Sequence, residues 1–289
     1  MLSINARSLA PGVNDWLANT NYPRILHVFD HVCNLINERG EILSLATPAI
    51  GNGPFNLVVE DDVFFSRFLS IESPISISQS QLILAGLTIN TAESKLWNPC
   101  PDWETLHDMR DDILTQLMSL SVPDYQPSIP NSLVSDLTFS LTRADGSTAK
   151  EAASQLAGLG QGLTPSGDDI LIGAIYATWI LHPTEVADAL AKEIANVAAP
   201  LTTSLSAAWL RAAGHGEAGV LWHKFFEALI FVSRKKSPMG IGNPTDGNLI
   251  QEAMDNILSI GETSGMDALA GFLAVFSAYK ERIIDQCPS

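Results

Sequence analysis

Two short segments of the chain, 98 residues apart, carry the same pattern of serine, glycine and aspartate. Residues 166–173 read S-G-D-D-I-L-I-G and residues 264–271 read S-G-M-D-A-L-A-G, so they share S-G-x-D-x-L-x-G. Each copy follows a turn that contains glycine and threonine, and each opens a strongly apolar stretch, which is typical of a buried helix. The pair therefore predicts two tight, polar helix starts that contribute to one site.

The chemistry that suits two such helix starts is the binding of a small anion. The start of a helix exposes backbone N–H groups and carries a partial positive charge, which attracts phosphate and carboxylate groups. Glycine lets the backbone approach a ligand closely, and serine or threonine hydroxyls add further donors. The expected substrate-binding residues are Gly160, Gly162, Thr164, Ser166, Gly167, Asp168, Thr263, Ser264 and Gly265.

Asp169 and Asp267 occupy the same position in the two motifs and are the candidate catalytic residues. They can act as a pair if the two helix starts face one another, whereas Asp168 would point about 100° away from Asp169 on a helix. One alternative is structural, because Ser166 with Asp169 and Ser264 with Asp267 each match the capping box S-x-x-D. Another is a hard-cation site on the carboxylates, but no third ligand is evident and we expect no metal.

A third segment, Thr202-Thr203-Ser204-Leu205-Ser206, also predicts a helix start. Pro200 suits the entry to a helix, and Thr202 or Thr203 is a plausible N-cap. Thr203 and Ser206 lie three residues apart and would share one face, as further substrate-binding residues. Arg211 is the most attractive cation for an anionic ligand, although an arginine on a helix surface is more often simply solvated.

The charge and the composition exclude several classes of partner. The chain has 32 acidic and 16 basic side chains, a net charge of −16, and no long Lys/Arg run, which disfavours nucleic-acid binding. The start of the chain lacks the apolar core of a signal peptide. The longest nearly unbroken apolar run, Ile170–Leu181, is shorter than the roughly 20 residues of a membrane span. These features predict a cytoplasmic protein with no membrane partner.

No known cofactor or nucleophile motif is present. Cys33, Cys100 and Cys287 are too few and too far apart for a disulfide framework or a metal cluster, and we expect reduced thiols. No Ser-His-Asp arrangement or G-x-S-x-G elbow can be identified. Residues 160–162 (G-Q-G) follow no strand-like run and lack a Gly-Lys-Ser/Thr ending, so they match neither a dinucleotide fingerprint nor a phosphate loop. We therefore expect no cofactor.

The first hundred residues are predicted to be rich in β-strands. Alternating or apolar runs at residues 41–47, 55–59 and 75–78 indicate strands, and Gly40 and residues 51–54 indicate turns. The segment 25–36 also fits a helical stripe, but a hairpin across residues 32–45 is favoured because the neighbouring strands need partners.

The rest of the chain is predicted to be mainly helical. Apolar residues recur at helical spacing from 106 to 118, and Pro123, Pro127 and Pro130 then indicate a loop. Ser147 and Thr184 are predicted N-caps of the helices that follow them. The expected fold class is α+β, with a smaller β-rich domain at residues 1–102 and a larger helical domain at 103–289 that carries the G-L-T-P-S-G-D-D and T-S-G-M-D motifs.

Four segments resemble a known family, and their order agrees with it. Residues 158–169 (G-L-G-Q-G-L-T-P-S-G-D-D) resemble the hallmark of the AllH-type proteins, and residues 202–216 and 260–271 resemble the two later motifs. Residues 51–55 (G-N-G-P-F) are similar to the glycine-rich turn near the family's N-terminus. The resemblance spans roughly residues 25 to 280. One departure is Glu262, where the family commonly has histidine.

The resemblance implies a transferase subunit with two other carbamoyltransferase subunits as partners. The enzyme, an oxamate carbamoyltransferase, exchanges a carbamoyl group between oxalurate and phosphate in anaerobic allantoin degradation, a branch of purine catabolism. The reaction gives oxamate and carbamoyl phosphate, so every substrate and product is a small anion, as the motifs predict. The alternatives are a non-catalytic assembly or anion-sensing subunit and a metal-dependent hydrolase on Asp168, Asp169 and Asp267, since a family does not fix a reaction.

Overall fold

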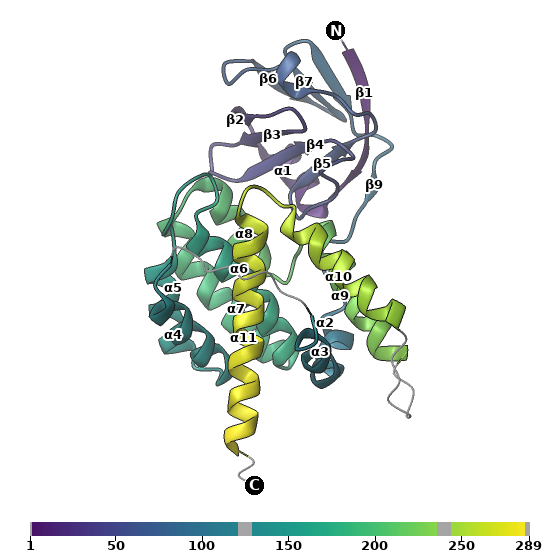
Figure 1. Cartoon of the computed structure of the whole chain (residues 1–289). Coiled ribbons are helices and arrows are strands. Elements are labelled where there is room, and N and C mark those ends of the chain that lie inside the picture. The colour runs from purple at the N-terminus through teal and green to yellow at the C-terminus, as the bar shows by residue number, and fades with distance from the viewer. Residues whose placement is uncertain (1, 121–128, 236–243, 287–289) are drawn as a thin grey trace. The chain divides into compact units, whose positions relative to one another are not determined.

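A computed structural model describes residues 2–120, 129–235 and 244–286 (Figure 1). The chain forms two compact units. The N-terminal unit comprises Met1–Pro99 with Ala218–Val220, and the helical unit comprises Cys100–Glu217 with Leu221–Ser289. The division at Pro99 lies three residues before the expected boundary at 102. The return of residues 218–220 to the first unit is a feature that composition does not indicate.

The N-terminal unit is built on one mixed sheet. Its strand order is β2-β3-β4-β5-β1-β8-β7-β6, and β9 pairs with β1. Strand β1 runs antiparallel to β5 and parallel to β8. The strands are β1 (Leu2–Leu9), β2 (Arg24–Val28), β3 (Val32–Ile36), β4 (Ile42–Ala46), β5 (Asn56–Val59), β6 (Ile75–Ser78), β7 (Gln81–Leu84), β8 (Leu87–Asn90) and β9 (Lys95–Leu96).

The hairpin predicted across residues 32–45 is confirmed. Strands β3 and β4 pair antiparallel with Cys33 opposite Leu45, and Gly40 in the turn has a φ of 77°, which glycine adopts without strain. The helical alternative for residues 25–36 is wrong, because these residues form β2 and β3. Burial of the β3 and β4 side chains in the core decides between the two periodicities.

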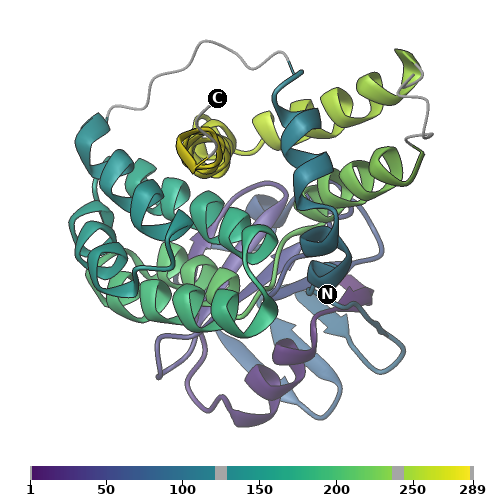
Figure 2. The same cartoon turned by 90° about the horizontal axis from the view of Figure 1, so that it is seen from below.

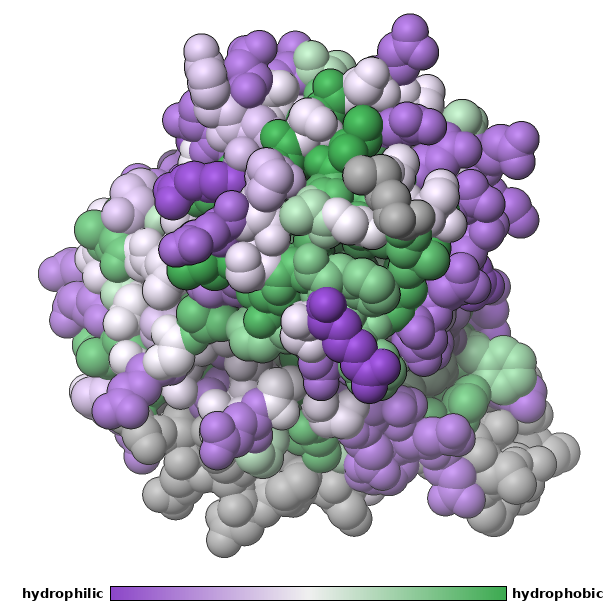
Figure 3. All heavy atoms as spheres, turned by 90° about the horizontal axis from the view of Figure 1, so that it is seen from above, coloured by the Kyte–Doolittle hydropathy of each residue, from purple (hydrophilic) through white to green (hydrophobic). Residues whose placement is uncertain are grey.

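The core of this unit lies between the sheet and α1 (Pro11–Asn19), which buries Val13 and Trp16. Some large apolar side chains stay exposed, among them Phe68 and Ile71, which follow the short 3₁₀ helix Phe65–Arg67. Figure 3 shows hydrophobic side chains gathered in the middle of one face and bordered by hydrophilic ones.

The helical unit packs around α6 (Ser166–Leu181), whose residues from Gly167 to Leu181 are all buried. Helix α6 contacts α11 (Ser264–Gln286), α7 (Thr184–Ala198) and α8 (Ser204–Gly214). Figure 2 looks almost along the axis of α11. The remaining helices are α2 (Trp103–Asp108), α3 (Arg110–Leu117), α4 (Asn131–Thr142), α5 (Gly146–Leu156), α9 (Val220–Lys235) and α10 (Pro244–Leu258). The expected α+β class is confirmed.

The structure corrects two local predictions, the N-caps of α5 and α7, and divides a third helical segment in two. The N-cap of α5 is Asp145, whose carboxylate accepts hydrogen bonds from the N–H groups of Ser147 and Thr148, so Ser147 is not the cap. Helix α7 begins at Thr184 with Pro183 as its N-cap. The helical pattern at 106–118 forms two helices that meet at Met109.

Two other predictions concern the cysteines and a membrane. Cys33 and Cys100 are free thiols. Pro123, Pro127 and Cys287 lie outside the described residues. No helix in the described part of the chain is long and apolar enough to cross a membrane.

Candidate functional site

The two sequence motifs lie against one another at the starts of α6 and α11. A side chain on Gly173 would overlap the carbonyl oxygen of Ala268, and a side chain on Gly271 would overlap the carbonyl oxygen of Ile170. Gly173 and Gly271 are the last residues of the two motifs, and Ile170 and Ala268 are the fifth. The contact is therefore reciprocal, and the motif glycines are required because the two backbones approach so closely.

The repeat extends to the helix and the turn that precede each motif. The N–H of Gly167 donates to the carbonyl of Leu159 at 2.8 Å, and the N–H of Gly265 donates to the carbonyl of Ile260 at 3.0 Å. Gly160 has a φ of 123°, and a side chain at this position would come within 2.7 Å of the backbone nitrogen of Ser166. Pairs α5–α6 and α10–α11 are thus two copies of one helix–turn–helix unit. Its sequence signature is confined to the glycines and the eight-residue motif.

The hydroxyl groups of Thr164 and Ser264 join the two copies, with 2.8 Å between Thr164 Oγ1 and Ser264 Oγ. Both side chains are partly exposed. Thr164 belongs to the nine-residue connection between α5 and α6, and Ser264 is the first residue of α11. These two expected substrate-binding residues are therefore brought together at the surface of the site.

Asp169 lies beneath these hydroxyls. Its side chain is 5% exposed, and Oδ2 has no hydrogen-bond partner in the described part of the chain. Burial raises the pKa of Asp169 to about 8, hydrogen bonding with Ser264 and Thr164 opposes the rise, and the negative charges of Asp267 and Asp168 add to it. Asp169 therefore keeps its proton at neutral pH.

Asp267, the equivalent residue of the second copy, is fully buried. Its backbone N–H donates to the carbonyl of Thr263 at 2.9 Å. The negative charge of Asp267 acts on Asp169. The two candidate catalytic carboxyl groups thus lie near one another, and the negative charge of Asp267 disfavours ionisation of Asp169.

Asp168 has internal partners for both of its oxygens. The N–H of Gly158 donates to Oδ1 at 2.8 Å, and the hydroxyl of Thr202 donates to Oδ2. Burial raises the pKa of Asp168, and hydrogen bonding with Thr202, Gly158 and Ser206 opposes the rise. The residue ties the turn after α5 to the segment before α8, a role that sequence reasoning missed because Thr202 lies 34 residues away.

The capping-box alternative is wrong for α6. The helix begins at Ser166, Pro165 is the N-cap, and no side chain caps it. The N–H of Gly167 is bonded to Leu159, and those of Asp168 and Asp169 are bonded to Pro165. The unbonded donors therefore lie in the preceding loop and at Ser166, the first residue of the helix. Within the described chain, no partner is found for the backbone N–H groups of Gly160, Gln161, Gly162, Leu163, Thr164 and Ser166.

The third motif packs against the loop of unbonded donors, residues 160–164, which we refer to as the donor loop. Thr203 is the N-cap of α8, as predicted, and its hydroxyl accepts from the N–H of Ser206 at 3.2 Å. The same hydroxyl donates to the carbonyl of Leu163 at 2.6 Å. Ser206 is fully buried near Asp168, and its Oγ makes no hydrogen bond of regular geometry in the described chain.

Four expected site residues are exposed, and Gly160 in the loop before α6 is one of them. Arg211 is exposed in the last turn of α8, about 12 Å along the helix from Thr203 at 1.5 Å per residue, so it is not brought to the donor loop. Gly162 and Thr263 are exposed in the two turns, together with Glu262. Among the described residues, no group of three or more His, Cys, Asp or Glu side chains is arranged to hold a metal ion.

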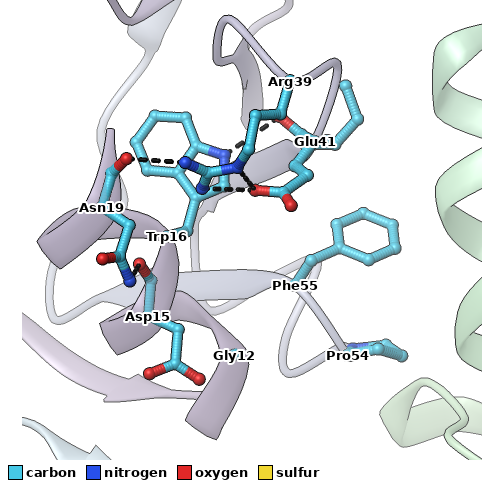
Figure 4. Close-up of a pocket in the computed structure, with 9 residues that line it drawn as sticks. Gly12, Asp15, Trp16, Asn19, Arg39, Glu41, Pro54 and Phe55 are labelled. Carbon is cyan, nitrogen blue, oxygen red and sulfur yellow. Dashed lines mark hydrogen bonds and ion pairs between the residues drawn. The ribbon is translucent and has the colours of Figure 1, made fainter. Parts of the chain in front are cut away.

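A cavity of about 430 Å³ lies in the N-terminal unit, lined in part by α1 and by Pro54 and Phe55 of the glycine-rich turn (Figure 4). Two of its charged groups, Arg39 and Glu41, are paired with each other. Arg39 donates from Nε and from one terminal nitrogen to Oε2 of Glu41, at 3.1 and 2.7 Å. The indole N–H of Trp16 donates to the carbonyl of Glu41 at 2.9 Å. Sequence reasoning did not identify this Arg–Glu pair.

The fold and the site define an α+β protein. In its helical unit the starts of α6 and α11 lie together, next to the buried carboxyl groups of Asp169 and Asp267. Family models match two stretches of the chain: the AllH family N-terminal domain matches residues 3–96, and the family described as oxamate carbamoyltransferase subunit AllH matches residues 156–276. Together they cover most of the chain, which belongs to the AllH family of carbamoyltransferase subunits. Searches of curated proteins and of solved structures found no match.

Proposed function

We propose that this subunit takes part in carbamoyl exchange between oxalurate and phosphate, and that the donor loop and the two helix starts hold the reacting anions. The observation that carries the proposal is the position of Asp169. Its buried Oδ2 has no hydrogen-bond partner among the described residues, and its carboxyl group lies beneath the two hydroxyl groups that the repeat brings together. A buried polar atom without a partner is costly in a folded protein and points to a functional role.

The donor loop, residues 160–164, provides the anion-binding groups. Its unbonded N–H groups lie at an exposed turn, and the hydroxyls of Thr164 and Ser264 lie beside it. The starts of α6 and α11 lie side by side, so their partial positive charges act in the same place. In this proposal the loop binds phosphate or carboxylate oxygens, and its N–H groups stabilise the charge that develops on the carbonyl oxygen under attack.

The proposed reaction needs a proton transfer but no covalent enzyme intermediate. An oxygen of hydrogen phosphate forms a bond with the carbamoyl carbon of oxalurate, and the C–N bond to the oxamate part breaks. The nitrogen keeps the electron pair of that bond and takes a proton, while phosphate gives up its own. Asp169 supplies the proton through the hydroxyl of Ser264 or Thr164 and regains one from phosphate, so it returns to its starting state.

Asp169 and Asp267 have different parts in this scheme. The pKa of about 8 keeps the Asp169 proton in place until the leaving nitrogen needs it. The nearby negative charge of Asp267 helps to maintain that raised pKa. Asp169 reaches the substrate through a hydroxyl group, so it is a positioning residue and a proton reserve rather than a direct ligand.

The test is phosphate-dependent cleavage of oxalurate, with carbamoyl phosphate as the readout, for the chain alone and mixed with the two expected partner subunits. We expect activity only in the mixture and a loss of at least 100-fold in Asp169→Asn, since general acid catalysis typically contributes 10²–10⁴-fold. Asp136→Asn, at an exposed position of α4, is the matched control and should retain full activity. Full activity of Asp169→Asn would overturn the proposed role.

A non-catalytic, anion-sensing subunit is the second candidate, because both Asp169 and Asp267 are buried. In that case the partner subunits alone would exchange the carbamoyl group, and this chain would change only their response to phosphate or oxamate. Activity of the partners without this chain would therefore replace the catalytic proposal by the sensing one.

A further inference from the structure

Three exposed leucine side chains lie in or beside the donor loop. Leu159, Leu163 and Leu201 are 36%, 40% and 53% exposed, respectively. We refer to these three residues as the leucine rim. Apolar side chains clustered beside a polar site are typical of a surface that another protein covers.

The backbone of each rim residue is tied to the site. The carbonyl of Leu159 accepts the N–H of Gly167, and the carbonyl of Leu163 accepts the hydroxyl of Thr203. The carbonyl of Leu201 lies so close to Gly158 that a side chain there would come within 2.7 Å of it. The rim is therefore a fixed part of the site, and a partner that binds it is placed directly over the donor loop.

The charge of the site is the second observation. The sequence around the donor loop and the motifs contains no lysine or arginine in residues 151–191, 193–210 and 237–279. The charges that act on Asp169 are those of Asp267 and Asp168, both negative. Phosphate carries up to two negative charges, and enzymes that transfer groups to or from it usually add Arg, Lys or a metal ion to backbone donors. The described elements around the loop supply no such cation.

We propose that the leucine rim binds one of the other carbamoyltransferase subunits, whose contact surface is apolar and carries at least one lysine or arginine directed at the donor loop. The inference rests on the proposed function. A basic partner complements the acidic site, and the apolar contact excludes the water that would otherwise hydrolyse the carbamoyl group. A second copy of this chain is disfavoured, because it brings a further net charge of −16 and the same acidic motifs.

The test of the rim uses Leu163→Asp and Leu201→Asp, singly and together. Leu249→Asp is the matched control, because Leu249 is 39% exposed on α10 and lies about 13.5 Å along that helix from its last residue, Leu258. We expect the rim variants to bind the partner subunits at least tenfold more weakly in analytical ultracentrifugation, with unchanged thermal unfolding of the chain alone. The control should bind as the parent does. Parent-like binding by the double rim variant would overturn the inference.

The test of the missing cation uses inorganic phosphate as the probe. The assembled parent complex should bind phosphate at least tenfold more tightly than this chain alone, and hydrogen exchange at residues 158–165 should slow on assembly. Equal phosphate affinity with and without partners would overturn the cation part of the inference. An assembly that depends on the rim but does not cleave oxalurate would refute the proposed function and leave the interface in place.

Discussion

Thr164 Oγ1 and Ser264 Oγ lie 2.8 Å apart although 100 residues separate them in the chain. The contact depends on the reciprocal packing of Gly173 and Gly271, which draws the starts of α6 and α11 together. Hydrogen bonding of both hydroxyls with Asp169 also opposes the rise that burial causes in the pKa of its carboxyl group. One pair of hydroxyl groups thus connects the two copies of the repeat to the proposed proton reserve.

We expect the two hydroxyls to be energetically coupled. Thr164→Val and Ser264→Ala each remove one partner and leave the other without it, so each should lower the free energy of unfolding by about 0.5–1.5 kcal/mol. The double variant should cost less than the sum of the two single variants, as for residues in direct contact. Urea unfolding of the parent, the two single variants and the double variant measures the coupling. Strict additivity would show that the hydroxyls do not interact in solution.

The adjacent residues Asp168 and Asp169 should respond in opposite ways to substitution. Asp168→Ala leaves the N–H of Gly158 and the hydroxyl of Thr202 without an acceptor, which should cost about 2–3 kcal/mol of unfolding free energy. Asp169 Oδ2 has no such partners in the described chain, so Asp169→Asn should leave the free energy of unfolding at neutral pH unchanged or higher. Thermal unfolding near pH 7 compares the two. Equal loss of stability in both variants would assign Asp169 a structural role.

The features that the sequence predicted correctly depend on local pattern. Alternation and glycine turns indicated the β3–β4 hairpin, and the apolar stretch after Asp169 indicated a buried helix. The caps were harder, because Asp145 and Ser147 both suit a helix start and only the backbone geometry selects Asp145. Local sequence does not determine which of two neighbouring polar residues meets the unbonded N–H groups.

The part of the site that sequence could not predict depends on contacts between distant segments. Thr202 and Asp168 lie 34 residues apart, and nothing near either residue indicates that they bond. The sequence predicts anion-binding donors at the helix start, whereas the structure has the unbonded N–H groups mainly in the loop. The N–H groups of residues 167–169 are bonded to the carbonyl groups of Leu159 and Pro165, which are backbone atoms without a sequence signature. The repeated motif was informative because both copies keep the glycines that close packing requires.

Stability should depend on pH through Asp169. Its folded-state pKa is about 8 and the ordinary value is 3.8, so between these values the folded protein holds a proton that the unfolded chain has lost. The free energy of unfolding therefore falls as pH rises, by about 1.4 kcal/mol per pH unit for one proton, and the trend ends near pH 8. Asp169→Asn should show a flatter profile and a growing advantage in Tm from pH 5 to pH 8.

Activity should follow the same group. In the proposed scheme the protonated form of Asp169 supplies the proton, so the phosphate-dependent cleavage of oxalurate by the assembled enzyme should decline as pH rises through about 8. A purely structural role would not produce this decline while the protein stays folded. A rate that increases through pH 8 would show that the ionised carboxylate is the active form.

The packing of the repeat itself can be tested at its two glycines. Gly173→Ala and Gly271→Ala each place a methyl group where a backbone carbonyl oxygen of the other helix lies, so the helices must separate. Overpacking of this kind typically costs 1–3 kcal/mol, more than the roughly 1 kcal/mol that alanine gains over glycine in a helix. We expect each variant to lower the free energy of unfolding and to weaken the Thr164–Ser264 coupling.

Gly12→Ala is the control, because Gly12 lies in α1 with no atom within 4 Å of the added methyl group. That substitution should be neutral or stabilising, since only the helix propensity changes. The comparison separates a general effect of alanine on helices from the specific contact between α6 and α11. If Gly173→Ala and Gly271→Ala also prove neutral, the two helices do not approach as closely as the structure shows. The shared site at their starts would then lose its physical basis.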